Sequence, residues 1–145
     1  MSSIQKQLHL GIYGLIEKDN LILVIRKSRG PYTGLFDLPG GRPSHGEAIL
    51  DTLSREIEEE TGIKAKSYSF LGNFSYLIPY QDVEGNQKEL HHIALTYRVK
   101  DIDFSSFNDS IVAEDVNGSL WIDRYQLRKE DSSPLLRSIL ESYEK

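Results

Sequence analysis

The segment from Ser44 to Gly62 predicts one amphipathic helix whose beginning and end are both marked. Ser44 and Glu47 have the spacing of a capping box, so we expect the helix to run from about Glu47 to Glu60. Gly62 is a residue type that commonly ends a helix. Three apolar residues recur every four positions and predict the buried face of the helix: Ile49, Leu53 and Ile57. Whatever surrounds this helix must cover that face.

Most of the remaining chain has the alternation or the branched apolar residues of β-strands. The segments that we expect to be extended are 8–16, 21–25, 35–38, 65–70, 74–78, 91–99 and 120–122. Residues 91–99 alternate most clearly, with the more polar side chains, His92 among them, on one face. Residues 101–118 are polar and predict an irregular segment. This order of elements indicates a mixed α+β domain.

A second helix is predicted to start at Ser133-Pro134, because proline is favoured in the first turn of a helix. Its apolar residues can cover one face of a sheet: Leu135, Leu136, Ile139 and Leu140. A break in regular structure is predicted before the first helix, at Pro39-Gly40-Gly41, where the backbone lies close to another group.

Length and composition indicate a single globular domain over residues 1–145. The formal net charge of -5 repels a polyanion and argues against a nucleic acid as partner. The chain has no cysteine, so disulfides and thiolate metal ligands are excluded and any metal must bind oxygen or imidazole. The N-terminus lacks the order of a secretory signal and no apolar run is long enough for a membrane helix, so we expect a cytoplasmic protein without a membrane partner.

Three carboxylates of the first helix, those of Glu56, Glu59 and Glu60, fall within an arc of roughly 100°. Like charges at this spacing destabilise a helix, and near its C-terminal end they also oppose the helix dipole. A hard divalent cation such as Mg²⁺ or Mn²⁺ explains the arrangement, because such ions prefer oxygen ligands. A solvated acidic face is the alternative.

The same helix lies within a longer motif, in which Gly41, Glu47, Arg55-Glu56-Ile57, Glu59-Glu60 and Gly62-Ile63 stand at fixed intervals. This motif resembles the complete box of the Nudix hydrolases, with no departure at any specified position. The resemblance covers residues 41–63 closely and the order of elements over nearly the whole chain. It implies a Nudix-type α/β/α sandwich with a mixed β-sheet around the box helix, in a MutT-like small hydrolase that acts on a nucleoside diphosphate linked to another group X.

The resemblance also implies roles for individual residues. Glu56, Glu59 and Glu60 would be the acidic metal ligands, and Glu56 is the first candidate to accept a proton from water. Arg55 would orient these glutamates, with support from Glu47. The backbone carbonyl of Gly41 would be a further ligand. The metal would be Mg²⁺, for which Mn²⁺ is a substitute.

Residues outside the motif are candidates with open alternatives. Members of this family often use an additional acid from a late loop, for which Glu114 and Asp115 are the candidates or else ordinary loop charges. The candidates for substrate binding are Arg26, Arg29, Tyr32 and His92. The two arginines form a cationic cluster with Lys27 that can grip phosphates, and Tyr32 can stack on a base. Their alternatives are a solvated loop for the arginines and a hydrogen-bonded sheet position for His92.

The function expected from the resemblance is the hydrolysis of a nucleoside triphosphate or a related small nucleotide. ADP-ribose, dinucleoside polyphosphates and the 5′ end of RNA are the alternative substrates. Pro79 and Tyr80, adjacent in the zone where subclasses of the family differ, do not decide between them. A nucleotide-sensing module without activity is the alternative from another class, and a homodimer is left open.

Overall fold

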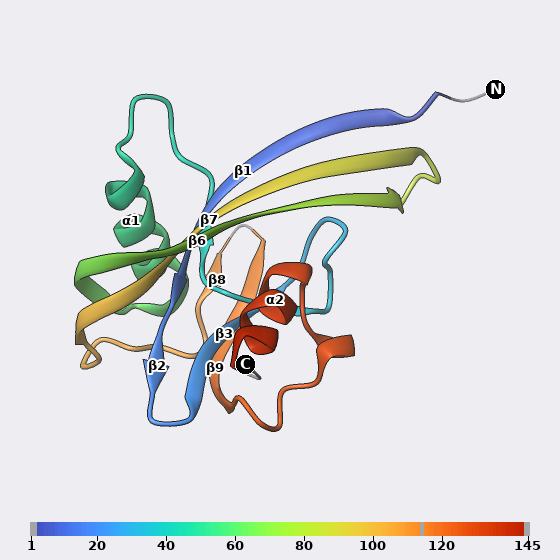
Figure 1. The fold of residues 1–145 in the computed structure, drawn as a ribbon. Helices are drawn as coiled ribbons and strands as arrows, with labels where there is room; N and C mark the ends of the chain where they lie inside the picture. Colours follow the sequence, from blue (N-terminus) through green and yellow to red (C-terminus); the bar gives the residue numbers. More distant parts are fainter. Residues whose placement is uncertain (1–2, 114, 144–145) are drawn as a thin grey trace.

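The computed structural model describes residues 3–113 and 115–143. Two helices and nine strands are assigned in these residues. In chain order they are β1 (Gln5–Leu15), β2 (Glu17–Lys18), β3 (Leu21–Lys27), β4 (Phe36–Asp37), β5 (Gly40–Gly41), α1 (Ile49–Thr61), β6 (Lys64–Gln81), β7 (Gln87–Asp103), β8 (Val112–Ala113), β9 (Val116–Asp123) and α2 (Pro134–Ser142), with a 3₁₀ turn at Lys129–Asp131 before α2. Figure 1 shows α1 and α2 on opposite sides of the strands.

The strands form two sheets. The first has the order β5-β1-β7-β6, in which β1 and β7 are parallel and the other pairs are antiparallel. The second has the order β2-β3-β9-β8, with β4 also paired to β3, and is antiparallel throughout. The expected mixed sheet and α/β/α layering are therefore confirmed.

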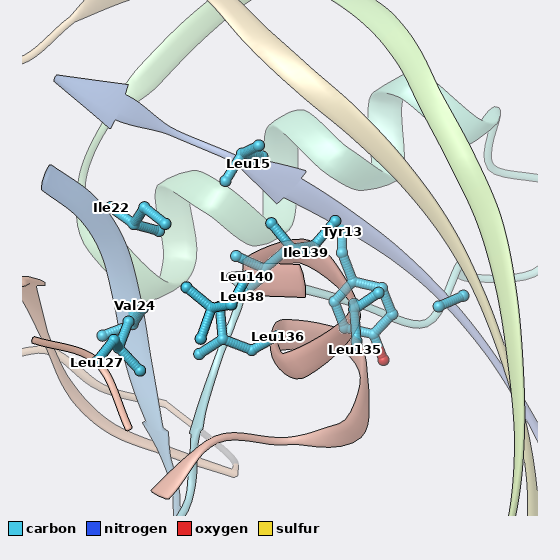
Figure 2. Packing of buried hydrophobic residues seen from close by; sticks show 11 residues of the cluster. Tyr13, Leu15, Ile22, Val24, Leu38, Leu127, Leu135, Leu136, Ile139 and Leu140 are labelled. Atoms are coloured by element: carbon cyan, nitrogen blue, oxygen red, sulfur yellow. The ribbon is translucent and has the colours of Figure 1, made fainter. Parts of the chain in front are cut away.

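Alternation along β1 and β3 divides the core between the two helices. One cluster lies on the side of α1 and consists of Ile12, Ile16, Leu23, Leu53, Ile57, Ile63 and Val99. The other lies on the side of α2 (Figure 2) and consists of Tyr13, Leu15, Ile22, Val24, Leu38, Ala94, Leu127, Leu135, Leu136, Ile139 and Leu140. All four apolar residues expected to cover a sheet from the second helix are buried there. The helix begins as expected, because the Ser133 hydroxyl accepts a hydrogen bond from the Leu136 N–H.

Strands β1, β6 and β7 continue together beyond the body of the molecule as a long arm (Figure 1). The sequence predicted two extended segments in 65–78, whereas β6 is one strand of 18 residues with an irregularity between Phe70 and Gly72. The inner surface of this arm contributes to the cleft described below. Within residues 3–113 and 115–143, no helix is long and apolar enough to cross a bilayer.

The predicted start of the first helix was wrong by two residues. Helix α1 begins at Ile49 after Ala48, and no side chain caps it. Ser44 donates its backbone N–H to the Glu47 carboxylate at 3.1 Å, so half of the capping box forms, but it closes a turn before the helix. Ile49 is 43% exposed, so its predicted place in the buried face was also wrong. The end at Gly62 is confirmed, with a left-handed φ of 77°.

Two further expectations about strands need correction. Residues 101–118, predicted as irregular, contain the end of β7, all of β8 and the start of β9. Gly40-Gly41, predicted to interrupt regular structure, forms β5 against β1. The expected close approach is real, because a Cβ on Gly40 would lie 2.1 Å from the Ile12 carbonyl oxygen. This pairing fixes the Gly40-Gly41 backbone beside the box helix.

Candidate active site

Glu60 is the most deeply buried of the three carboxylates predicted to share one face of α1. It is 2% exposed, and its Oε1 accepts a hydrogen bond of 2.8 Å from the Gly40 N–H. Burial raises the pKa of Glu60 well above its ordinary value, and the hydrogen bond from Gly40 opposes this only in part. A buried carboxylate without a cationic hydrogen-bond partner among the described residues is a site where a positive ion would be stabilised.

Arg55 holds the other acidic side chains of the motif in place. Its Nε and Nη2 donate to the two carboxylate oxygens of Glu47 at 2.8 and 2.9 Å. Its Nη1 donates to Glu56 at 2.9 Å and to Glu59 at 3.2 Å. The Arg55 hydrogen bonds, with smaller contributions from Thr52 and the Ser44 backbone, lower the pKa of Glu47 to about 2. Glu47 is therefore an anion that anchors Arg55, as the resemblance implies.

Gly41 lies directly against Glu56. A Cβ at position 41 would be 2.6–2.8 Å from the atoms of the Glu56 carboxyl group, so only glycine leaves this space open. Burial raises the pKa of Glu56, while its hydrogen bond with Arg55 and the positive charge of Arg55 lower it. Glu56 is thus more basic than an exposed glutamate and faces the Gly41 backbone.

These residues open onto a cleft made of two cavities with shared walls. The first, which we call the acidic cavity, has a volume of about 430 Å³ and includes Gly41, Glu56, Glu59 and Glu60 in its wall. The second, the aromatic cavity, has a volume of about 510 Å³ and includes Tyr32, Tyr80, Leu90 and His92. The residues that line both are His9, Tyr13, Lys27, Arg42 and Asp115. Together the cavities have the size of a small-molecule site.

The structure brings several of the predicted residues to this cleft. Arg29, Tyr32 and His92 line the aromatic cavity, and Asp115 lies between the two cavities, where it binds Lys27 Nζ at 2.9 Å. Arg26 lines neither cavity; its guanidinium lies 4.8 Å from the centre of the Phe36 ring. Glu114, the other candidate for a late acidic ligand, lies outside the described residues.

Of the residues that line both cavities, three were not assigned to a site from the sequence: His9, Tyr13 and Arg42. His9 and Tyr13 lie on the same face of β1, and the parallel register places β1 beside β7 with His9 opposite His92. The signal that could have found His9 is its polar side chain within an alternating apolar strand. The signal that could have found Arg42 is its position directly after Gly41 of the motif.

A network of polar contacts connects these side chains. Tyr13 Oη lies 2.8 Å from His92 Nε2 and 3.4 Å from His9 Nε2, and Tyr32 Oη lies 2.9 Å from His92 Nδ1. Arg42 donates to His9 Nδ1 at 3.0 Å. Burial lowers the pKa of both histidines to about 4, with a further contribution to His9 from the charge of Arg42 and to His92 from His9. Both imidazoles are therefore neutral at pH 7.

The donor set of the acidic cavity fits a hard divalent cation, because it consists of carboxylate oxygens and a glycine backbone with space beside it. Within residues 3–113 and 115–143, no three His, Asp or Glu side chains are grouped as a ready-made metal site. Glu56 and Glu59 are held by Arg55 instead. A cation at this position would therefore compete with Arg55 for their oxygens and would neutralise the buried Glu60.

Comparison with known proteins identifies the class to which this fold and motif correspond. Residues 6–141 match the model of the NUDIX domain, and the chain therefore belongs to this family. A MutT NUDIX hydrolase from Burkholderia pseudomallei has a similar structure, with a TM-score of 0.70, 25% sequence identity and coverage of 93% of this chain and 97% of that one.

Two curated relatives are similar over part of the chain. An ADP-ribose pyrophosphatase from Methanocaldococcus jannaschii is 43% identical over 77 residues, which are 53% of this chain and 44% of that protein. The mRNA-decapping protein g5R of African swine fever virus is 35% identical over 75 residues, which are 52% of this chain and 30% of that protein. The similarity thus spans less than half the length of these relatives.

Proposed function

We propose that this chain is a metal-dependent hydrolase that cleaves the pyrophosphate linkage of a nucleoside triphosphate or a related small nucleotide. The observation that carries the proposal is the position of the buried Glu60 beside Glu56 and Glu59, on one face of α1 that opens onto the cleft. The matched motif and the NUDIX family support it.

Glu56, Glu59, Glu60 and the Gly41 carbonyl are the residues that would hold Mg²⁺, with Mn²⁺ as a substitute. When bound, the ion would neutralise charge on the phosphate oxygens and lower the pKa of the attacking water. Asp115, between the two cavities, is the one described candidate for an additional acid. Its hydrogen bond to Lys27 competes with that role.

The chain's own residues supply the remaining functions. Glu56 is suited to accept the proton of the attacking water, because its carboxylate lines the acidic cavity beside the Gly41 backbone. Arg55 keeps Glu56 and Glu59 directed to one side of the helix. Lys27 and Arg42 line both cavities and provide positive charge where a pyrophosphate would cross from one to the other.

The aromatic cavity provides room for the rest of a nucleotide beyond the pyrophosphate. The names of the two curated relatives make ADP-ribose and the 5′ end of RNA the alternative substrates to test. The formal net charge of -5 favours a small nucleotide over a polyanion such as RNA.

The proposal is tested by a phosphate-release screen with Mg²⁺ or Mn²⁺, in which pyrophosphatase and phosphatase reveal the products. The panel comprises nucleoside triphosphates, oxidised dGTP, ADP-ribose, dinucleoside polyphosphates and triphosphorylated RNA. We expect hydrolysis of at least one small nucleotide, a loss of about 10²-fold or more in kcat for Glu59→Gln, and full activity for Glu58→Gln. Glu58 is an exposed neighbour on the same helix and outside the motif. Turnover of no compound, with nucleotide binding intact, would instead identify a sensing module.

A further inference from the structure

We propose that a directional chain of hydrogen bonds, starting at Arg42, makes the Tyr32 hydroxyl an obligatory donor into the aromatic cavity, where it binds an acceptor atom of a nucleobase and so orients the base. This inference rests on the proposed function for the position of the pyrophosphate. Its test is chosen so that the two can fail separately.

The direction of the hydrogen bonds is set at Arg42, because a guanidinium can only donate hydrogen bonds. Arg42 Nη2 lies 3.0 Å from His9 Nδ1, so Nδ1 must be the unprotonated nitrogen of His9. A neutral imidazole with an unprotonated Nδ1 carries its proton on Nε2. The His9 Nε2–H therefore points at the Tyr13 hydroxyl, 3.4 Å away.

The next hydrogen bond in this direction runs from the Tyr13 hydroxyl to His92. Its hydroxyl has two partners in the described part of the chain, the Nε2 atoms of His9 and His92. Because His9 Nε2 is a donor, the only acceptor for the Tyr13 O–H is His92 Nε2 at 2.8 Å. The alternative would leave a buried hydroxyl proton unpaired, which is costly. His92 must then carry its proton on Nδ1.

The series of hydrogen bonds ends at Tyr32. His92 Nδ1–H donates to the Tyr32 hydroxyl oxygen at 2.9 Å. The Tyr32 O–H needs an acceptor of its own, and residues 3–113 and 115–143 provide none for it. Tyr32 and His92 both line the aromatic cavity, so the missing acceptor belongs to the molecule that fills it.

The walls of the cavity indicate the chemical class of that molecule. Aromatic rings of Tyr32, Tyr80 and His92 surround it, together with Leu8 and Leu90. Such surfaces favour a flat ring, since stacking on aromatic side chains stabilises bases without regard to their hydrogen-bond pattern. The Tyr32 donor adds an orientation that stacking lacks, because the base must place a carbonyl oxygen or an unprotonated ring nitrogen at this point.

The direction of the hydrogen bonds is tested on metal-free protein without nucleotide. Long-range ¹⁵N–¹H NMR correlations distinguish the two tautomers of a neutral imidazole. We expect protonation of His9 at Nε2 and of His92 at Nδ1, and loss of the single His92 tautomer in Tyr13→Phe. Protonation of His92 at Nε2 in the wild-type protein would overturn the proposal, whether or not the protein hydrolyses nucleotides.

The role of Tyr32 is tested by equilibrium binding of AMP, GMP, CMP and UMP, which have no pyrophosphate to cleave. We expect wild-type protein to bind at least one of them, and Tyr32→Phe to weaken that binding about tenfold while inorganic phosphate binds equally to both. Tyr97→Phe is the control, because Tyr97 is outside the cavity and packs against Phe70 on the other face of β7. Binding of no monophosphate by the wild type, or equal binding by Tyr32→Phe, would overturn the assignment, as would a parallel loss of phosphate binding.

Discussion

Arg55 and Glu47 form a two-pronged ion pair across the turn that precedes α1, with distances of 2.8 and 2.9 Å. The pair uses both carboxylate oxygens of Glu47 and two different nitrogens of Arg55. It leaves the third guanidinium nitrogen, Nη1, to hold Glu56 and Glu59. Arg55 therefore connects the segment that contains Glu47 to the acidic face of the helix.

These hydrogen bonds of Arg55 predict that Arg55→Lys retains the positive charge but no longer orients the glutamates. Lysine has one nitrogen and cannot donate in a fixed fork, so Glu56 and Glu59 lose their orientation. We expect kcat/KM for the best substrate of the screen to fall about 10–100-fold, with a change in the free energy of unfolding of about 1 kcal/mol or less. Steady-state kinetics and urea denaturation measure the two effects. Wild-type kinetics in the lysine variant would show that the fork is not needed.

The low pKa of Glu47 predicts how stability depends on pH. Its pKa is about 2 in the folded protein and about 4.5 ordinarily, so the unfolded chain binds more protons between these values. The stabilisation from ionised Glu47 is complete above pH 4.5 and is lost as the pH falls toward 2. We expect the wild-type free energy of unfolding to decrease more steeply between pH 5 and pH 2.5 than that of Glu47→Gln. Parallel curves in urea denaturation would contradict this account.

Glu60→Gln separates the structural role of Glu60 from metal binding. The amide oxygen of glutamine can still accept the Gly40 N–H, and the change removes a buried charge. We expect the metal-free variant to be at least as stable as the wild type. Saturating Mg²⁺ should raise the wild-type Tm by about 5–10 °C, from the linkage between binding and stability, and that of Glu60→Gln by much less. Thermal unfolding with and without EDTA measures both. An equal Mg²⁺ shift in the two proteins would remove Glu60 from the ligand set.

Gly41→Ala tests the space beside Glu56. The added Cβ would lie 2.6–2.8 Å from the Glu56 carboxyl group, which must move away. We expect the variant to fold and kcat to fall at least tenfold, because the displaced carboxylate can no longer face the Gly41 backbone. Gly72→Ala is the matched control, since its Cβ would meet the Phe74 ring at an ordinary 3.5 Å. Full activity of Gly41→Ala would show that Glu56 has no fixed position in the reaction.

The box helix and its ligands were accessible from the sequence because they are local. The spacing of Glu56, Glu59 and Glu60 determines their common face whatever the surrounding fold is. The start of the helix was predicted two residues too early, because Glu47 accepts from the Ser44 N–H in a turn before the helix and also bonds to Arg55 and the Thr52 hydroxyl. Ile49 followed the apolar period but lies in the exposed first turn.

The aromatic cavity could not be derived in the same way, because it depends on long-range pairing. His9 and His92 are neighbours only because β1 and β7 pair in parallel, and no local pattern specifies that register. The more polar face of β7, which carries His92 and Thr96, points inward, and both side chains are buried. Polar residues on an inward strand face were therefore the available signal for the cleft.

The most direct test of the account is the binding of Mn²⁺, followed by electron paramagnetic resonance, to the wild type, Glu59→Gln and Glu58→Gln. Glu59 and Glu58 are adjacent glutamates with the same chemistry, and only Glu59 lines the acidic cavity. We predict that the wild type and Glu58→Gln bind Mn²⁺ with the same affinity, and that Glu59→Gln binds it at least tenfold more weakly. Equal affinities in all three proteins would contradict the assignment of this helix face as the metal site.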